Sequence, residues 1–144
     1  MEQVRPYAEV LEKLRSVGLR PTRQRMALAK LLFTGTDRHV TAEILHAEAV
    51  ENNVRVSLAT VYNTLHQFTT AGLLREIAVD ATRSSFDTNT TEHHHFYFED
   101  TGELVDIPGD QMPLPNLPAP PTGGTVSRVD VVVRLNSAEH KSVA

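Results

Sequence analysis

Residues 53–87 read NVRVSLATVYNTLHQFTTAGLLREIAVDATRSSFD, and this stretch decides the fold. Ser57 is expected to begin a helix as its N-cap, because its hydroxyl can accept a hydrogen bond from a backbone N–H one turn later. Gly72 is expected to end the helix in a left-handed conformation. Between them, apolar side chains recur at spacings of three and four, which predicts one narrow buried stripe: Leu58, Val61, Leu65 and Phe68.

The opposite face of this helix is polar and carries no acid; it holds Thr60, Tyr62, Asn63, His66 and Gln67. Two short extended runs follow at residues 73–79 and 83–86, joined by a turn at 80–82. A helix with a neutral polar face and a hairpin directly behind it is typical of the recognition helix and wing of a DNA-binding domain. An ordinary amphipathic surface helix is the alternative for this segment taken alone.

Three further helices are predicted ahead of this stretch, over residues 4–17, 22–35 and 41–53. The inward side chains of the third are expected to be Ile44, Leu45, Ala49 and Val50. Helices with short connections, followed by a helix and a hairpin, indicate a winged helix-turn-helix with one extra N-terminal helix. We therefore predict an α+β fold in which residues 1–87 form a DNA-binding domain.

The composition restricts the chemistry that the chain can perform. The chain has 144 residues, of which 40% are hydrophobic, and it contains no cysteine. Disulfides, thiolate catalysis and cysteine-ligated zinc or iron–sulfur sites are therefore excluded, and any metal must be held by His, Asp and Glu. No apolar run reaches membrane-spanning length and the N-terminus lacks a signal sequence, so we expect a cytoplasmic protein that does not enter a membrane.

The charge is unevenly distributed. The net charge is −4, but residues 1–79 hold ten Lys/Arg against eight Asp/Glu, whereas residues 80–144 hold four against ten. Residues 15–25 contain no acid and four arginines: Arg15, Arg20, Arg23 and Arg25. Contact with DNA phosphates requires a local basic patch of this kind, whereas a merely solvated face would interleave acids.

The second domain is predicted over residues 88–144 as a small three-stranded sheet. Three histidines, His93, His94 and His95, open a strand, and the alternation after an acidic turn predicts its hairpin partner at residues 104–107. Six prolines between residues 108 and 121 predict an extended connector with little helix, and residues 126–135 form the last strand. A sheet of this size rarely stands alone, so we expect these residues to form a homodimer.

Four segments together resemble the ferric uptake regulator (Fur) family of metal-responsive winged-helix transcription factors. They read LRPTRQRMALAKLL, HVTAEIL, VSLATVYNTLHQFTTAGLL and the histidine-rich run that ends in TGELVDI, and they span most of residues 10–107. The resemblance implies an N-terminal DNA-binding domain and a C-terminal α/β dimerisation domain. That division agrees with the one predicted from the residues.

The chain departs from the family pattern at two places. It has no cysteine pairs for structural zinc, and MPLPNLPAPPTGGTVSRVDVVVRL stands where the family has its dimerisation helix. This segment and HHHFYFEDTGELVDIP resemble the iron response regulator (Irr) branch of the family. That resemblance implies indirect iron sensing through haem, and control of genes of iron and haem metabolism.

The histidine triplet is the expected sensor. Successive residues of a strand face opposite sides, so His93 and His95 share one side and His94 takes the other. Two such imidazoles can chelate a metal ion, or one can ligate haem iron. By resemblance, His39 and Asp87 match family ligands and would join His93 and His95 around a divalent Fe, Mn or Zn ion. The alternative is that all three histidines are ordinary polar residues at a hinge.

We therefore interpret the chain as a homodimeric transcriptional regulator that responds to iron through haem, with direct Fe(II), Mn(II) or Zn(II) sensing as the alternative. The expected DNA-binding residues are Arg15, Arg20, Arg23, Arg25, Ser57, Thr60, Tyr62 and Asn63. A His/carboxylate metalloenzyme is disfavoured, because no ligand set has an obvious general base beside it and half of the chain would have no role. A winged helix that docks other proteins is also disfavoured, because an acidic recognition face would favour it and this face carries no acid.

Overall fold

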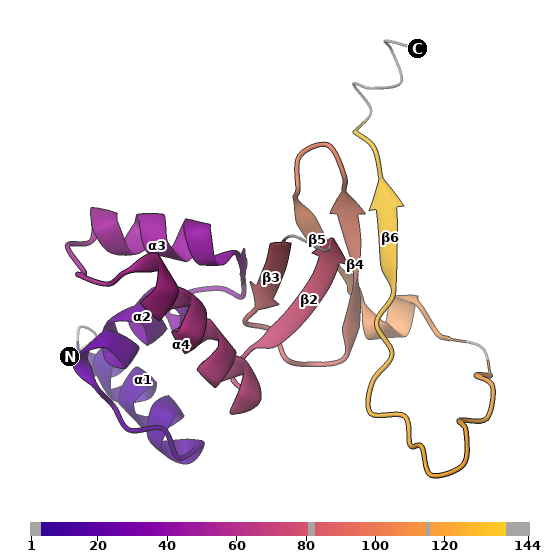
Figure 1. Cartoon of the computed structure of the whole chain (residues 1–144), viewed down its shortest axis with the longest axis horizontal. Helices are drawn as coiled ribbons and strands as arrows, with labels where there is room; N and C mark the ends of the chain where they lie inside the picture. The colour runs from indigo at the N-terminus through magenta and orange to yellow at the C-terminus, as the bar shows by residue number, and fades with distance from the viewer. Residues whose placement is uncertain (1–3, 81–82, 115, 138–144) are drawn as a thin grey trace. The chain divides into compact units, whose positions relative to one another are not determined.

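The computed structural model describes residues 4–80, 83–114 and 116–137. The chain divides into two compact units, residues 1–90 and 91–144, so the division falls three residues beyond the one expected from the sequence (Figure 1). Within the described residues, no helix has the length and apolar character needed to cross a membrane. The first unit contains the four α-helices of the described residues, and both units contain a three-stranded sheet.

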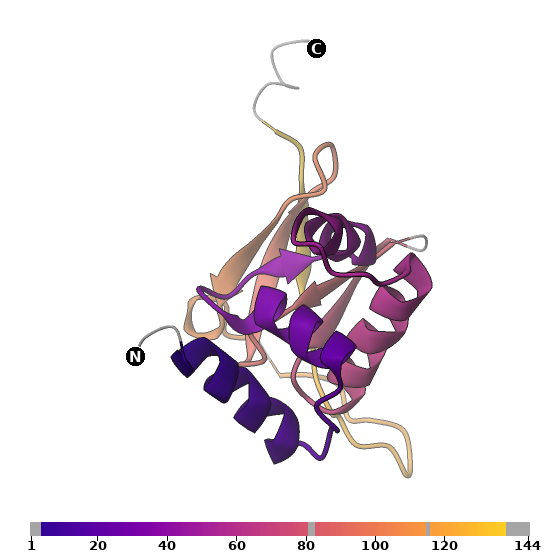
Figure 2. The ribbon, with the colours of Figure 1, turned by 90° about the vertical axis from the view of Figure 1, so that its left-hand side faces the viewer.

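Four helices form most of the first unit: α1 (Val4–Ser16), α2 (Arg23–Phe33), α3 (Ala42–Glu51) and α4 (Leu58–Thr70). Figure 2 turns them toward the viewer. The last three each begin directly after a capping hydroxyl, as expected for Ser57 ahead of α4. The hydroxyls of Thr22, Thr41 and Ser57 each accept a hydrogen bond from the backbone N–H three residues later. Gly72 has φ 89° directly after α4, the left-handed conformation predicted for the end of this helix.

The core of the first unit confirms most of the predicted stripe on α4 and corrects three positions. Val61, Leu65 and Phe68 are fully buried. Leu58, Ile44 and Val50 are 43%, 47% and 60% exposed, so the prediction that they face inward was wrong.

The helix geometry explains these three errors. Adjacent helical residues point about 100° apart, so Ile44 and Val50 cannot share the narrow face that their neighbours Leu45 and Ala49 already occupy. Leu58 is the first residue of α4 and precedes the turn at which the helix begins to contact the core.

A three-stranded antiparallel sheet completes the first unit, with strand order β1-β3-β2. The predicted hairpin is present as β2 (Arg75–Asp80) and β3 (Arg83–Asp87). Its expected turn includes residues 81 and 82, which lie outside the described residues. The third strand, β1 (His39–Val40), was not predicted, because two residues carry no periodicity of their own. β1 pairs with the end of β3 and places His39 opposite Asp87.

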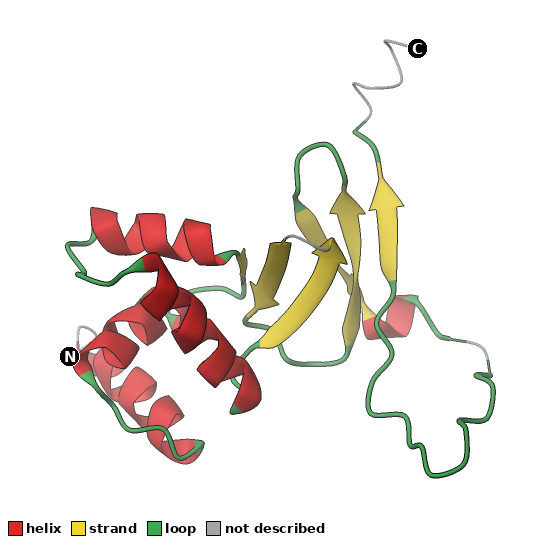
Figure 3. Ribbon diagram, viewed as in Figure 1, coloured by secondary structure: helices red, strands yellow, loops and turns green. Residues whose placement is uncertain are grey.

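The second unit is the predicted small sheet, with strand order β5-β4-β6. β4 (His93–Phe98) and β5 (Leu104–Pro108) form the hairpin, and β6 (Val132–Leu135) pairs with β4 in parallel. The last strand is shorter than expected and begins six residues later than residue 126. A single 3₁₀ turn, η1 (Gly109–Gln111), opens the long loop drawn in green in Figure 3, and residues 91–114 and 116–137 contain no α-helix.

The interior of the second unit is small and unusually polar. Among its described residues, the buried apolar side chains are those of Tyr97, Leu104 and Ile107. The three histidines of β4 are buried beside them, with 2–3% of their surface exposed. Because buried polar side chains are stable only when they are hydrogen-bonded or bind a ligand, the histidines require an explanation of their own.

Candidate metal centre and nucleic-acid interface

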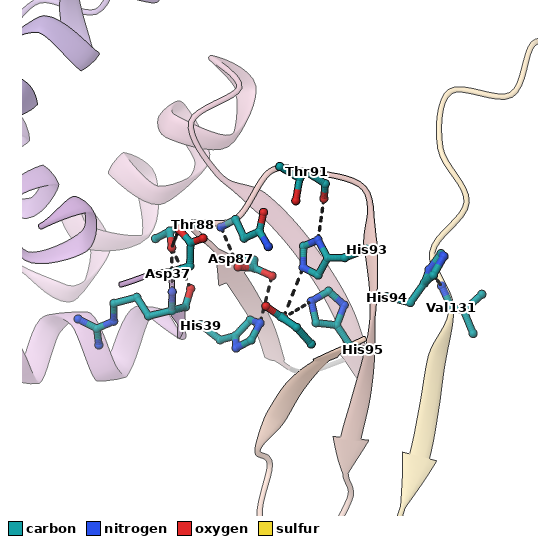
Figure 4. A network of polar contacts seen from close by, with 12 residues as sticks. Asp37, His39, Asp87, Thr88, Thr91, His93, His94, His95 and Val131 are labelled. Atoms are coloured by element: carbon teal, nitrogen blue, oxygen red, sulfur yellow. Dashed lines mark hydrogen bonds and ion pairs between the residues drawn. The ribbon is translucent and has the colours of Figure 1, made fainter. Parts of the chain in front are cut away.

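The first unit places one imidazole against one carboxylate. The β1–β3 register sets His39 opposite Asp87, and the Nε2 atom of His39 lies 3.0 Å from the Oδ2 atom of Asp87 (Figure 4). Asp87 is fully buried and its other carboxylate oxygen accepts a hydrogen bond from the backbone N–H of Asn89 at 2.9 Å. A buried carboxylate with a fixed orientation and an adjacent imidazole forms a pair of N and O donors suited to a divalent cation.

Arg38 anchors the short strand that carries His39. Its backbone N–H donates to the Thr88 hydroxyl at 2.8 Å, and the Thr88 N–H donates back to the Arg38 carbonyl at 3.0 Å. Its guanidinium donates through both terminal nitrogens to the carboxylate of Glu48 on α3. These hydrogen bonds raise the pKa of Arg38 above its usual value, against an opposing effect of burial. β1 is thereby attached to both β3 and α3.

The second unit brings two imidazoles to one carboxylate. His93 and His95 share a side of β4, as the strand alternation predicts, and their ring centroids are 4.5 Å apart. The Nε2 atom of each ring lies 3.4 Å from the same oxygen, Oδ1 of Asp106. Asp106 comes from β5, where the antiparallel register sets it opposite His95. Two nitrogens and a carboxylate oxygen therefore converge within this unit.

The tautomer of His93 suits metal binding. Its Nδ1 atom lies 2.6 Å from the carbonyl oxygen of Thr91, which can only accept a hydrogen bond. In a neutral ring, Nδ1 must therefore carry the proton, and the lone pair is on Nε2, the atom that faces Asp106. Metal-binding histidines in proteins commonly donate their second ring N–H to a carbonyl in this way. His93, His95 and Asp106 thus offer, within the second unit, nitrogen and oxygen donors of the kind that bind a divalent ion.

His94 faces a different group. Its Nδ1 atom accepts a hydrogen bond from the backbone N–H of Val131 at 3.1 Å, as Figure 4 shows. This contact ties the end of the long loop to β4, directly before the residues of β6. The three predicted histidines therefore have two different roles. His93 and His95 face the carboxylate of Asp106, and His94 binds the backbone of Val131.

Sequence reasoning missed Asp106. Its signal lies in the hairpin register, because counting outward from the acidic turn places Asp106 opposite His95 and on the same side of the sheet. The turn length has to be known before this count can be made. Residues 99–103 leave that length open in the sequence alone.

The predicted DNA-binding residues lie on α1, α2 and α4 or between them. Arg15, Arg20 and Arg23 are exposed near the end of α1, in the following loop and at the start of α2. On α4, Tyr62 and Asn63 are exposed, and 47% of the Tyr62 side chain is accessible. These side chains are therefore accessible to DNA.

Three of the predicted DNA-binding residues already make side-chain hydrogen bonds within the protein. The Ser57 hydroxyl accepts from the Thr60 N–H at 3.0 Å and caps α4, and it also donates to the Thr60 hydroxyl at 2.9 Å. The guanidinium of Arg25 donates through Nε and Nη2 to the Oε1 atom of Gln67, at 3.2 and 3.1 Å. Nη1 of Arg25 donates to the carbonyl of Arg20. Arg25 therefore fastens the start of α2 to α4.

A hollow of about 310 Å³ lies between the start of α2 and α4. Its lining contains no acid, and it unites three predicted DNA-binding residues with four others: Arg25, Thr60 and Asn63, with Thr22, Gln24, Thr64 and Gln67. Gln67 belongs to the polar face that the sequence indicated, but its role as the partner of Arg25 depends on a contact across 42 residues. Such a partner cannot be found from local spacing.

Comparison with known proteins gives consistent matches. Residues 16–114 match the sequence model described as the ferric uptake regulator family. The peroxide-responsive repressor PerR of Staphylococcus aureus (strain Mu50 / ATCC 700699) is 33% identical over 104 residues, which cover 72% of this chain and 70% of that protein.

Solved structures of similar fold include two ferric uptake regulators. The one from Pseudomonas aeruginosa, determined with manganese, is 25% identical and has a TM-score of 0.65 over 88% of this chain and 96% of its own. The one from Vibrio cholerae has a TM-score of 0.69 over 88% and 98% of the two chains. At 20% identity, the second likeness shows the fold alone.

Proposed function

Because the chain belongs to the ferric uptake regulator family, we propose that it is a transcriptional regulator whose affinity for DNA depends on a bound divalent metal ion. The observation that supports this most strongly is the arrangement of His93 and His95, whose Nε2 atoms both face one carboxylate oxygen of Asp106. If the three histidines were ordinary polar residues at a hinge, we would expect them to be exposed to solvent. Instead all three are buried, and two of them share a carboxylate.

His39, Asp87, His93 and His95 are the proposed ligands of the ion. The proposal rests on the family resemblance and on the donor chemistry of each pair, with His39 and Asp87 in one unit and His93 and His95 in the other. Asp106 either joins them or orients the two histidines. An ion that takes donors from both units restricts their movement, and it changes DNA affinity through its preference for the arrangement that it stabilises.

Fe(II), Mn(II) and Zn(II) are the ions that this donor set suits, because it combines imidazole with carboxylate and contains no sulfur. The similar protein from Pseudomonas aeruginosa was determined with manganese, which makes Mn(II) the natural first probe. When bound, the ion supplies a positive charge that binds the carboxylates and imidazoles together.

Haem sensing, implied by the resemblance to the Irr branch, has less support. An axial ligand must present its nitrogen to the face of the haem. Here the Nε2 atoms of His93 and His95 face Asp106. The Nδ1 atom of His94 accepts a hydrogen bond from the Val131 N–H, so in a neutral ring the proton is on Nε2 and neither nitrogen offers a lone pair to iron. We therefore favour direct sensing of a divalent ion over haem.

DNA binding is assigned to the first unit, and the regulator is proposed to act as a homodimer through the second. Arg15, Arg20 and Arg23 would contact phosphates, and Tyr62 and Asn63 would contact base edges in the major groove. Arg25 has two further N–H groups beyond its three hydrogen bonds to Gln67 and Arg20, and these can reach a phosphate.

Calorimetric titration with Mn(II) tests the metal assignment. The wild type should bind Mn(II), and His93→Ala should weaken binding at least about tenfold because it removes a ligand. His46→Ala, which removes a half-buried histidine from α3, is the matched control and should bind as the wild type does. A Soret shift with haem that disappears in His93→Ala, with no binding of Mn(II), Fe(II) or Zn(II) by the wild type, would instead support haem sensing.

A further inference from the structure

Three aromatic rings form a row from the recognition helix to the wing of the first unit. Tyr62 and His66 lie one turn apart on α4, with ring centroids 4.5 Å apart and the rings edge-to-face. On its other side, His66 meets the ring of Phe86 on β3, with centroids 5.5 Å apart and an interplanar angle of 88°. His66 thus provides an aromatic contact between α4 and β3.

The row runs from the interior to the surface. Phe86 is fully buried, His66 is half-buried and Tyr62 is 47% exposed. Because Phe86 is buried in a closely packed interior, a shift of β3 that moved its ring would disturb the edge-to-face contact with His66. The exposed ring at the end of the row is one of the proposed base-reading residues. The ring that Tyr62 packs against is therefore itself in contact with a residue of the core.

The inner end of the row lies beside the candidate metal ligands of the same unit. Phe86 directly precedes Asp87, and the two residues pair with Val40 and His39 on adjacent rungs of the β1–β3 ladder. A change in the distance between His39 and Asp87 therefore acts on the strand that carries Phe86. The whole path, from ligand pair to helix surface, lies within one compact unit.

We propose that His66 is a positioning residue that holds Tyr62 in its DNA-reading orientation and links that orientation to the strand carrying Asp87. The link to metal rests on the function proposed above, whereas the positioning of Tyr62 does not depend on it. His66 acts by packing, so an aromatic replacement should preserve its role. If His66 were only an ordinary packing residue, its replacement would lower stability but would not change the affinity for specific DNA more than the affinity for random DNA.

The test uses the full chain and a duplex selected from a random-sequence library by the Mn(II)-loaded protein, with a scrambled duplex for comparison. His66→Ala should weaken binding to the selected duplex about 3- to 10-fold, the range typical of one aromatic contact, and leave the scrambled duplex nearly unaffected. His66→Phe should retain most of the affinity. Thermal unfolding of both variants checks that the domain is still folded, and His46→Ala is the control.

A double-mutant cycle with Tyr62→Ala then separates positioning from independent effects. In the Tyr62→Ala background, His66→Ala should cause no further loss, because there is no ring left to position. Equal losses with and without Tyr62, or equal losses on both duplexes, would overturn the proposal. The cycle is run on metal-free protein as well, so that it does not depend on metal loading.

A third experiment tests the link to the ligand strand. It compares the affinity of the wild type and of His66→Ala for the selected duplex with and without saturating Mn(II). His66→Ala should bind Mn(II) as tightly as the wild type but lose at least half of the fold-increase in DNA affinity that Mn(II) produces. An unchanged increase would overturn the link to the ligand strand while leaving the proposed function intact. If the DNA affinity of the wild type responds to none of Mn(II), Fe(II) and Zn(II), the proposed function and the link both fail, and the metal-free cycle alone decides the positioning role.

Discussion

Asp106 lies 3.4 Å from the Nε2 atoms of both His93 and His95, and its side chain is 37% exposed. We expect Asp106→Asn to weaken Mn(II) binding about 10- to 100-fold, because a neutral amide neither attracts the ion nor orients both rings. Asp110→Asn removes an exposed carboxylate from the neighbouring 3₁₀ turn and should have no effect. Calorimetry compares the two variants, and equal affinities would remove Asp106 from the site.

Phosphate and base contacts should respond differently to mutation. Arg23→Ala should weaken binding to all DNA sequences alike and reduce the slope of log affinity against log salt by about 0.9, the value for one phosphate contact. Tyr62→Ala should weaken the selected duplex more than a scrambled one. Fluorescence anisotropy at several salt concentrations distinguishes them. If both variants lost specific and random binding in the same ratio, the assigned roles would be wrong.

The side of a strand or helix on which a side chain lies could be predicted from the sequence where periodicity alone determines it. The alternation of β4 correctly placed His93 and His95 on one side, because it depends only on their being in a strand. The partners of the same residues were not predictable. Asp106 and Gln67 reach their contacts through a hairpin register and through the packing of two helices, and neither is determined by local spacing.

The start of the recognition helix allows capping and DNA contact to be separated. Ser57→Ala should lower the free energy of unfolding by about 1 kcal/mol, because the Thr60 N–H loses its acceptor. Ser57→Asp keeps an acceptor and should retain the stability, but its negative charge should weaken DNA binding. Urea unfolding and anisotropy measure the two effects. Unchanged DNA affinity in Ser57→Asp would show that Ser57 lies away from the phosphates.

Helices and strands whose ends are marked by local residues were predicted from the sequence, whereas those whose ends depend on a partner strand were not. The capping residues and the glycine after α4 determine backbone conformation locally, so three helix starts were located correctly. β1 has two residues and exists only because β3 pairs with it. For β6, the alternation of valines extends back to residue 129, but pairing with β4 begins only at Val132. Strand ends thus depend on the partner strand.

The whole molecule is proposed to be a homodimer held by the second unit, which buries few apolar side chains within itself. Val132 and Val133 are adjacent on β6 and face opposite sides of the sheet. At least one of Val132→Asp and Val133→Asp should therefore give monomers in sedimentation. Val126→Asp alters an exposed side chain of the long loop and should leave the dimer intact. A dimer in both strand variants would refute this assignment.

At the scale of the molecule, the two-part organisation could be predicted because composition changes along the chain. A basic, helix-patterned half precedes an acidic, histidine- and proline-rich half. The preferred ligand could not be predicted in the same way. Histidines that follow one another in sequence suit either haem or a metal ion, and only their orientation toward Asp106 and Val131 favours the ion.

The central claim is that a divalent ion bound by histidine and carboxylate controls DNA affinity. The most direct test is anisotropy with the selected duplex, titrated with metal-free protein and with Mn(II)-saturated protein. We expect Mn(II) to lower the Kd of the wild type at least about fivefold, the lower end of typical allosteric coupling. The double variant His93→Ala/His95→Ala should show one Kd in both conditions. Equal affinities of the wild type with and without Mn(II), Fe(II) or Zn(II) would contradict the claim.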